Sequence, residues 1–419
     1  MYAGQKVPIQ NVSPCPVSCS LENWGHKGSP LFWFCNTFYT IRLASHFFFK
    51  PLYIKPLPLS VLAPAHPYFA QALLEWYPRH RRDLPWRHTR DPYAIWLSEV
   101  ILQQTRVKQG LPYYLDFVTT YPTVHDLAAA AEDEVLRHWQ GLGYYSRARN
   151  MHHTAQQVVR EYDGLFPNTY HDLLKLRGVG QYTAAAIASF AFGEKVAVLD
   201  GNVYRVLSRV FGITSDIAAP APRKEFQALA DTLIPAAAPD EFNQAIMEFG
   251  AIQCTPLKPD CLFCPLQSQC YAFQHGMVQE LPVKSKAKAG RTRYFHYLVL
   301  RYGDTLYLKK RGPKDIWQGL YDFALTETDA AELPAAELVD IVAALGGQLT
   351  TNRAEEPVVS LRHVLSHQKV EARFYPVWLE HPLSSQALAA SGLAPFTLEQ
   401  AHKLPKPILI ANYIDKSQK

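Results

Sequence analysis

The stretch that decides the fold is residues 176–202, which reads LRGVGQYTAAAIASFAFGEKVAVLDGN. Its GVG triplet at 178–180 predicts a tight turn between two helices, because two glycines around one apolar residue let the backbone turn sharply. The second helix begins at Gln181, and the N–H groups and dipole at such a helix start favour a bound phosphate. An apolar run then ends at Asp200. The stretch therefore predicts either a plain αα-hairpin with Asp200 as a helix N-cap, or a phosphate site with a functional carboxylate beside it.

Length and composition predict a globular chain of two or three domains, since its 419 residues are 48% apolar. The formal charge is +5, but the excess belongs to residues 1–65, which carry five Lys or Arg against one Asp or Glu. Residues 66–290 carry 22 residues of each sign and are neutral. Any nucleic-acid contact by the body of the chain must therefore use local clusters and backbone donors rather than bulk charge.

Residues 1–65 do not resemble a domain, because they are rich in proline and show no helical period. Their apolar run at 31–41 is too short to span a bilayer and lies too far from Met1 to be a signal-peptide core. We expect either a translation start placed too far upstream or a real, poorly ordered extension.

Residues 66–275 show helical patterns and predict a mainly α domain. Asp91 is a fitting N-cap with Pro92 at the first helical position, and the helix is expected to cover residues 93–109. Glu99 lies among apolar positions of this helix. Its carboxyl is therefore either on a solvated helix face or an acid whose pKa is perturbed by burial.

The second half of the chain shows a different period. Residues 276–292 place lysines among small residues and predict a linker. The alternating runs 294–301 and 305–310, separated by Gly303 and Asp304, predict a β-hairpin. Further strands are expected at 358–361 and 369–379, with helices near 331–345 and 398–404. Residues 293–419 are thus expected to form an α+β domain.

Four of the seven cysteines fall within seventeen residues, with the spacing C-x6-C-x2-C-x5-C: Cys254, Cys261, Cys264 and Cys270. Such clustering favours a metal centre over a disulfide framework, and so a reducing compartment. Four thiolates at this spacing suit either a [4Fe–4S] cluster or an all-cysteine zinc site.

Six segments together resemble the MutY family of adenine DNA glycosylases, within the helix-hairpin-helix DNA glycosylase superfamily. They are LPWR (84–87), DPYAIWLSEVILQQTRV (91–107), QGLGYYSRARN (140–150), LRGVGQYTA (176–184), VLDGN (198–202) and IWQGLY (316–321). The resemblance implies a helix-hairpin-helix glycosylase fold with a [4Fe–4S] loop at 254–270, and a C-terminal domain related to MutT-type Nudix hydrolases. The glutamate cluster that Nudix hydrolysis needs does not follow Gly319, so we do not expect that activity.

The resemblance also implies the catalytic residues. Breaking an N-glycosidic bond places positive charge on the sugar and negative charge on the leaving base. Glu99 stands where the family carries its acid. Burial among apolar neighbours would let this carboxyl keep its proton near neutral pH. Asp200 matches the carboxylate that stabilises the oxocarbenium-like sugar and must stay ionised. Tyr182 stands where the related endonuclease III carries a lysine nucleophile, which implies base removal without strand cleavage.

The remaining implied contacts are with duplex DNA from which the target adenine is flipped out. Gln104 and Tyr144 would fill or wedge the vacated stack, while Arg87 and Tyr182 would line the pocket. The matching residues that would bind DNA are Arg87, Gln104, Tyr144, Gly178, Gly180 and Asn202.

A C-terminal loop is expected to read 8-oxoguanine opposite the adenine. Ser366 and His367 match the family's loop, and Leu365 replaces its phenylalanine. The implied substrate is double-stranded DNA with adenine opposite 8-oxoguanine or guanine. We expect a monomer in the cytoplasm, associated with the nucleoid and with no membrane contact. Two alternatives remain: an endonuclease III-like glycosylase/AP lyase, and a non-catalytic iron–sulfur DNA-binding protein.

Overall fold

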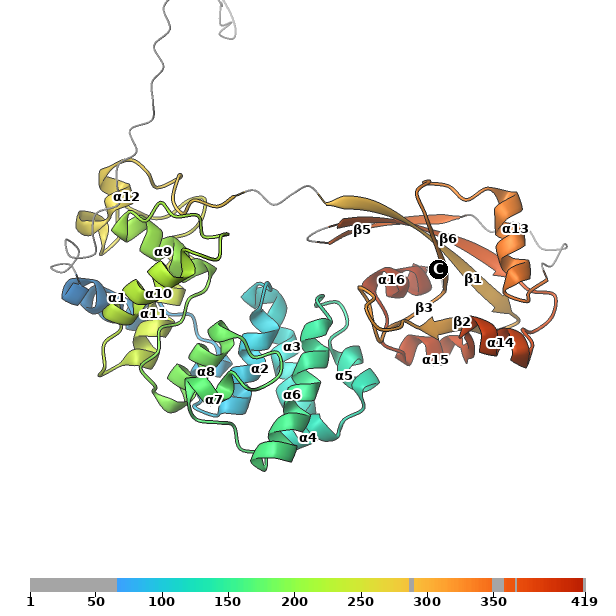
Figure 1. Cartoon of the computed structure of the whole chain (residues 1–419), viewed down its shortest axis with the longest axis horizontal. Helices are drawn as coiled ribbons and strands as arrows, with labels where there is room; N and C mark the ends of the chain where they lie inside the picture. The colour runs from blue at the N-terminus through green and yellow to red at the C-terminus, as the bar shows by residue number, and fades with distance from the viewer. Residues whose placement is uncertain (1–65, 286–289, 349–357, 366–367, 417–419) are drawn as a thin grey trace, which may run out of the picture. The chain divides into compact units, whose positions relative to one another are not determined.

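The computed structural model describes residues 66–285, 290–348, 358–365 and 368–416 (Figure 1). The first of these ranges is helical, and the others form a sheet with helices. The predicted fold class, a mainly α region followed by an α+β domain, is confirmed. No helix in these ranges is both long enough and apolar enough to cross a membrane.

The helical region buries two apolar cores. Trp96, Phe117 and Trp139 belong to one core, and Phe69 and Phe249 belong to the other. The elements are α1 (His66–His80), η3 (Pro85–Arg87), α2 (Pro92–Leu102), α3 (Val107–Thr120), α4 (Val124–Ala129), α5 (Glu132–His138), α6 (Ser146–Tyr162), α7 (Tyr170–Leu173), α8 (Gln181–Phe192), α9 (Gly201–Phe211), α10 (Arg223–Leu233), α11 (Pro239–Ile252), η4 (Gln267–Gln269) and α12 (Tyr271–Gln274). Helix α8 contacts α2 from the first core and α11 from the second, so the two groups of helices meet there.

The start of α2 is as predicted, but its end is not. The Asp91 carboxylate accepts a hydrogen bond from the Tyr93 N–H at 3.1 Å, which confirms the N-cap. The single helix expected at 93–109 is wrong, because α2 ends at Leu102 and α3 begins at Val107. The last carbonyls of α2 bond to the buried Arg147 side chain instead of to a further helical turn.

The α+β region contains β1 (Arg291–Tyr302), β2 (Thr305–Lys310), β3 (Tyr321–Asp322), β4 (Ala324–Thr328), β5 (Val359–Leu365), β6 (Gln368–Trp378) and β7 (Ala394–Thr397). The strand order is β3-β2-β1-β6-β5, with β4 paired to β1 and β7 paired to β2. The predicted hairpin of β1 and β2 is confirmed by the pairing of Tyr302 with Thr305. The long central strands β1 and β6 run parallel.

Helices cover both faces of this sheet, as the continuous run of buried side chains at residues 295–300 of β1 requires, because successive side chains of a strand point to opposite faces. They are α13 (Ala335–Ala344), α14 (Ser385–Ser391), α15 (Leu398–Lys403) and α16 (Ile408–Lys416). On one face, Leu298 and Leu300 pack in a cluster with Val342 of α13. On the other face, Tyr413 of α16 stacks on Phe374 of β6 at 4.3 Å between ring centroids.

Candidate active site

The predicted hairpin turn connects α7 to α8. Gly178 has φ +75°, and a Cβ there would lie 2.8 Å from the Cβ of Asn150, so both backbone and space require glycine. Gly180 is the N-cap of α8 in extended conformation, and a Cβ there would meet nothing within 4 Å. Both glycines line one cavity. The N–H groups in the first turn of α8, which have no partner within the helix, therefore lie beside an open space.

Glu99 lies on α2 with only 6% of its surface exposed, so it is not on a solvated helix face. The hydroxyl of Tyr182, from α8, donates a hydrogen bond to Glu99 Oε2. Burial raises the pKa of Glu99 to about 7, and the charge of Asp200 adds to the rise. The hydrogen bond from Tyr182 and the positive charge of Arg87 oppose it. Glu99 is therefore a perturbed acid that holds its proton close to neutral pH.

Asp200 is the N-cap of α9, as one interpretation of the sequence proposed. Its Oδ1 accepts from the Val203 N–H at 2.7 Å, and its Oδ2 accepts from Asn202 Nδ2 at 2.6 Å. Burial raises the pKa of Asp200, and these hydrogen bonds together with Arg205 act in the opposite direction. Asp200 also lines the cavity, so the cap and the functional interpretation describe the same carboxylate.

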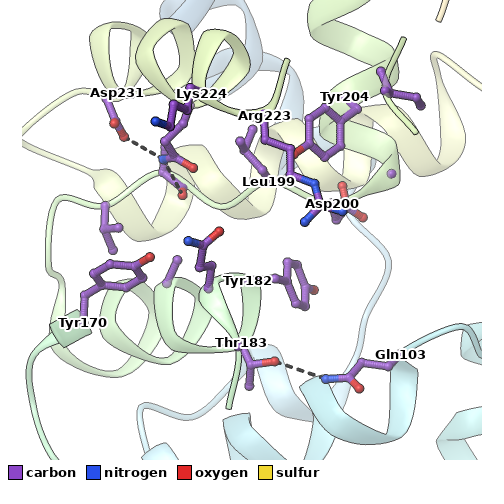
Figure 2. Close-up of a pocket in the computed structure, with 18 of the residues that line it drawn as sticks. Gln103, Tyr170, Tyr182, Thr183, Leu199, Asp200, Tyr204, Arg223, Lys224 and Asp231 are labelled. Atoms are coloured by element: carbon purple, nitrogen blue, oxygen red, sulfur yellow. Dashed lines mark hydrogen bonds between the residues drawn. The ribbon is translucent and has the colours of Figure 1, made fainter. Parts of the chain in front are cut away.

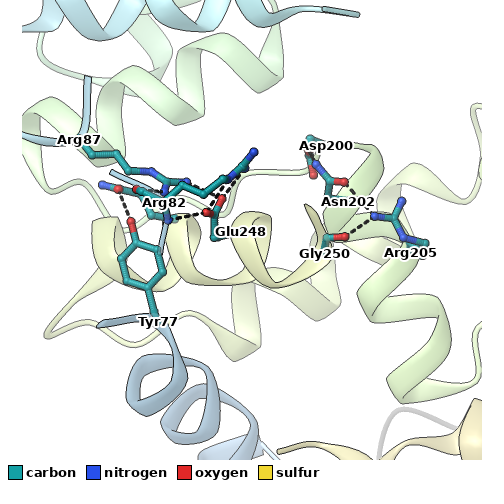
Figure 3. Close-up of polar contacts among 9 residues, drawn as sticks. Tyr77, Arg82, Arg87, Asp200, Asn202, Arg205, Glu248 and Gly250 are labelled. Atoms are coloured by element: carbon teal, nitrogen blue, oxygen red, sulfur yellow. Dashed lines mark hydrogen bonds and ion pairs between the residues drawn. The ribbon is translucent and has the colours of Figure 1, made fainter. Parts of the chain in front are cut away.

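A series of hydrogen bonds connects Asp200 to the cysteine segment. Figure 3 shows its first part, from Asp200 through Asn202 to Arg205. Arg205 Nη2 donates to Asn202 Oδ1 at 2.9 Å and to the Gly250 carbonyl at 2.6 Å. Arg205 Nε donates to the Cys254 carbonyl at 2.8 Å. Sequence reasoning missed Arg205, although an arginine within the apolar face of a helix was a usable signal.

Arg87 belongs to an ion-paired group of two arginines around the buried Glu248, and it does not stand free in the pocket. Its Nη2 donates to Glu248 Oε2 at 2.7 Å, and Arg82 Nη2 donates to the same oxygen at 2.6 Å (Figure 3). Burial would raise the pKa of Glu248, but the two arginines lower it to about 2. Glu248 of α11 was not identified from the sequence. This ion pair fixes η3 against α11, near Glu99.

A cavity of about 1400 Å³ opens between these helices. Tyr182 of α8 and Asp200 at the start of α9 both line it (Figure 2). Gln104 contributes from the connection after α2. Its far wall adds basic side chains that the sequence analysis did not single out: Lys195, Arg223 and Lys224. Glu99 lies behind Tyr182 and is not part of the lining. The cavity lining therefore combines the Asp200 carboxyl with nearby cations, and Glu99 lies one side chain behind it.

Gln104 and Tyr144, predicted to enter the base stack, both have left-handed backbone conformations, with φ values of +54° and +49°. Gln104 is exposed in the connection between α2 and α3, and Tyr144 is 44% exposed in the connection before α6. Left-handed φ values are uncommon outside glycine and store local strain at functional segments. The arrangement presents both side chains outward. Arg87 and Tyr144 are absent from the cavity lining.

The four cysteines follow α11 and surround η4, and all four are partly buried. Burial raises the pKa of Cys264 to about 12, and the charges of Cys254, Cys270 and Cys261 also raise it. The thiols are therefore electrostatic neighbours. Arg209 Nη1 lies 3.4 Å from the Cys254 sulfur. Among the described residues, no three His, Cys, Asp or Glu side chains are grouped closely enough to hold one metal ion.

The predicted lesion-reading residues Ser366 and His367 lie outside the described residues. Their neighbours Leu365 and Gln368 end β5 and begin β6, and these two residues pair with each other.

Fold and site together define a base-excision DNA repair enzyme of the helix-hairpin-helix class. Residues 97–233 match the model of the HhH-GPD superfamily of base excision DNA repair proteins, and residues 296–416 match the model of the NUDIX domain. The adenine DNA glycosylase of Buchnera aphidicola from Acyrthosiphon pisum is 34% identical over 256 residues, which cover 61% of this chain and 73% of that protein. The human adenine DNA glycosylase is 46% identical over 222 residues, covering 51% of this chain and 41% of that protein.

The chain belongs to the adenine DNA glycosylase family, as its motifs predicted. Among solved structures, a thermostable thymine-DNA glycosylase is similar, with 32% identity and a TM-score of 0.48. That similarity covers 51% of this chain and 99% of the other.

Proposed function

We propose that this glycosylase removes adenine opposite 8-oxoguanine or guanine in duplex DNA, with Glu99 as the acid and Asp200 as the stabilising carboxylate. The observation that carries the proposal is the difference between two buried carboxyls, Asp200 in the cavity lining and Glu99 directly behind Tyr182. Glu99 has a pKa of about 7 and one hydroxyl donor, whereas Asp200 accepts from a backbone N–H and a side-chain amide. Hydrogen bonds to a carboxylate favour its ionised form.

This division of roles matches the charges that form during base release. Glu99 gives its proton to adenine N7, so the base leaves as a neutral molecule when the N-glycosidic bond breaks. The sugar that remains is oxocarbenium-like, and the negative charge of Asp200 stabilises it. A water molecule then adds to C1′ and releases one proton, which replaces the proton that Glu99 gave.

Tyr182 supports base removal without strand cleavage. A glycosylase/lyase needs an amine that forms a Schiff base with the sugar, and a phenol provides none. The Tyr182 hydroxyl instead donates to Glu99, and burial raises the pKa of Tyr182 well above its usual value. This contact disfavours the endonuclease III-like alternative.

DNA is proposed to bind across the cavity mouth. The N-terminus of α8 beside Gly178 and Gly180 suits a backbone phosphate, and Asn202 at the start of α9 suits a second contact. Gln104 and Tyr144 are exposed where they would fill the space left by the flipped adenosine. The cavity is large enough for one flipped nucleotide.

Reading of 8-oxoguanine is proposed for Ser366 and His367. The lesion differs from guanine by an added oxygen and an N7–H, and a serine hydroxyl is both donor and acceptor. The support is the sequence of this loop, which resembles that of the family. Ser366→Ala with His367→Ala should reduce the preference for 8-oxoguanine over guanine by roughly ten- to a hundredfold, the value of one base contact. Equal loss on both duplexes would contradict this role.

The cysteines are proposed to hold a [4Fe–4S] cluster. The donor set is entirely thiol, the thiols are electrostatic neighbours, and Arg209 beside Cys254 compensates negative charge. A cluster needs a wider cage than a single zinc ion, because each cysteine binds a different iron. When bound, the cluster supplies structural support for the segment that Arg205 connects to Asn202. Zinc in place of iron and sulfide after anaerobic purification would overturn this proposal.

We also propose that the glycosylase domain extends over residues 66–275 and the lesion-recognition domain over residues 293–419. The enzyme is proposed to act as a monomer on chromosomal DNA, in the cytoplasm at the nucleoid.

The deciding experiment uses a duplex with one adenine opposite 8-oxoguanine, incubated under single-turnover conditions with and without alkaline treatment. Base release that gives strand breaks only after alkali is the expected result. Glu99→Gln and Asp200→Asn should each abolish release while the duplex still binds, and Glu161→Gln on the surface of α6 is the matched control. Strand breaks without alkali would favour the lyase alternative. Binding without release by the unaltered protein would favour a non-catalytic role.

A further inference from the structure

A buried arginine joins the two segments that present Gln104 and Tyr144. Arg147, in the first turn of α6, is 9% exposed. Its Nη1 lies 2.9 Å from the carbonyl oxygens of Val100 and Ile101. The same nitrogen lies 2.6 Å from the carbonyl of Gln103. One guanidinium nitrogen therefore contacts two carbonyls in the last turn of α2 and the carbonyl of the residue that follows the helix.

The second nitrogen of the same guanidinium holds the other segment. Arg147 Nη2 donates to the carbonyl of Gly143 at 3.1 Å, and Trp139 Nε1 donates to that carbonyl at 2.9 Å. The guanidinium also lies over the Trp139 ring at 5.0 Å and over the Tyr144 ring at 5.6 Å. Gly143 immediately precedes Tyr144, as Gln103 precedes Gln104. The residue before each exposed side chain is thus bonded to one planar group.

The position of Arg147 is not explained by its own helix. A cation in the first turn faces the positive end of the helix dipole, which is unfavourable. The C-terminal carbonyls of α2 form the negative end of a different dipole and lack partners within their helix. Arg147 supplies those partners. Arg147 therefore stabilises the two connections, after α2 and before α6, and does not stabilise its own helix.

Both connections hold conformations that the chain does not adopt without support. Gln104 and Tyr144 have left-handed backbones, and neither is glycine. Such residues persist only where surrounding contacts fix them. Hydrogen bonds to the preceding carbonyls, Gln103 and Gly143, orient the peptide groups that lead into each strained residue. The two strained residues consequently depend on the same side chain.

We propose that Arg147 is a positioning residue that sets Gln104 and Tyr144 as one unit, so that both enter the base stack together when adenine is flipped out. The proposal rests on the proposed function, because it takes these two side chains as the ones that enter the DNA. It assigns a role to a side chain that does not itself line the cavity. A lysine at this position would keep the charge but could not bridge two segments, since it lacks the planar fork.

The test compares Arg147→Lys with Arg160→Lys, an exposed arginine on the same helix. Single-turnover release of adenine opposite 8-oxoguanine should fall roughly tenfold to a hundredfold in Arg147→Lys, because misplacement of about 1 Å has effects of this size. Emission from a 2-aminopurine placed beside the target adenine should fall in parallel, since the stack opens less. The pH at which the rate declines should stay unchanged, because Glu99 remains in place.

Coupling between the two side chains is the decisive measurement. In the unaltered protein, the effects of Gln104→Ala and Tyr144→Ala on release should be non-additive, as expected of residues that act as a unit. In the Arg147→Lys background the same two changes should become additive. Retained non-additivity, or a release rate equal to that of Arg160→Lys, would overturn the proposal. A shifted pH limb would assign the effect to Glu99 and would overturn it as well.

Hydrogen exchange without DNA separates this inference from the proposed function. Faster exchange in Arg147→Lys should be confined to residues 103–105 and 143–145. Uniformly faster exchange with loss of folded protein would show a general stability role and would contradict the inference. If Gln104→Ala and Tyr144→Ala left release and emission unchanged, their proposed role in DNA would fail. The exchange measurement would still decide whether Arg147 holds both segments.

Discussion

Removing the Tyr182 hydroxyl should move the alkaline limit of base release to higher pH. The hydroxyl donates to Glu99 Oε2, and this bond lowers the pKa of Glu99 against the larger effect of burial. Tyr182→Phe keeps the ring and loses the donor. The ionised form of Glu99 is then less favoured, so its pKa rises above about 7. Because the proposed acid works protonated, the active form persists to higher pH in the variant.

The size of this shift follows from the strength of the lost bond. A hydrogen bond to a charged group contributes roughly 1.5–3 kcal/mol, and one pKa unit corresponds to about 1.4 kcal/mol. The limit should therefore rise by roughly one to two units. The maximal rate is a separate quantity and should fall, because Tyr182 also lines the cavity.

The assay is single-turnover release of adenine opposite 8-oxoguanine, measured between about pH 5 and pH 9, with alkaline cleavage of the product strand. Tyr204→Phe is the matched control, because Tyr204 lines the same cavity and its side chain does not contribute to the pKa shift of Glu99. The limit should stay in place in this control. A limit that stays unchanged or moves to lower pH in Tyr182→Phe would refute the assignment of Glu99 as the acid.

Three further changes test the site by other measurements. Glu99→Gln should raise the free energy of unfolding by up to roughly 3 kcal/mol above about pH 7, because ionised Glu99 is buried there at a cost that builds up between pH 4.5 and about 7, where the unfolded chain has lost the proton and the folded protein still holds it. Chemical denaturation near pH 4 should show no such gain, because the carboxyl is protonated in both states. Asp200→Asn should keep the cap to Val203 and the melting temperature while abolishing release, whereas Asp200→Ala should also lose about 1 kcal/mol of stability in thermal unfolding. Cys261→Ser should lower bound iron and folded yield together, and full iron content in this variant would exclude Cys261 as a ligand.

The sequence correctly predicted the caps, turns and helix starts that depend on interactions between residues close together in the chain. The Asp91 cap, the turn at Gly178 and the start of α8 at Gln181 each depend on a few neighbouring residues, and each is present in the structure. The β1–β2 hairpin followed from Gly303 and Asp304 for the same reason. Such signals are carried by backbone conformation and capping hydrogen bonds, which act over a few residues.

Contacts between distant segments were beyond local signals. Nothing near residue 103 indicates that α2 ends at Leu102, and the carbonyls at that end bond to Arg147, more than forty positions later. The hydroxyl of Tyr182 reaches Glu99 across 83 positions, and Glu248 meets Arg82 across 166. Family motifs supplied Glu99 and Tyr182 as candidates, but only the fold shows that they touch. Glu248 lies outside the six family segments, and only the fold shows that it is buried and paired with Arg82 and Arg87.

Asp200 shows why the structural and functional interpretations of one residue need not compete. The N-cap bond from Val203 and the amide bond from Asn202 hold both carboxylate oxygens in fixed positions. A fixed, hydrogen-bonded carboxylate is already oriented before charge develops on a sugar, so no reorganisation is needed at that moment. The same donors favour the ionised form against burial, which raises the pKa of Asp200. Glu99 has a single hydroxyl donor and stays protonated near neutral pH. A capping interaction that ordinarily stabilises a helix thus opposes the effect of burial on Asp200 and favours the charged form that the proposed chemistry requires.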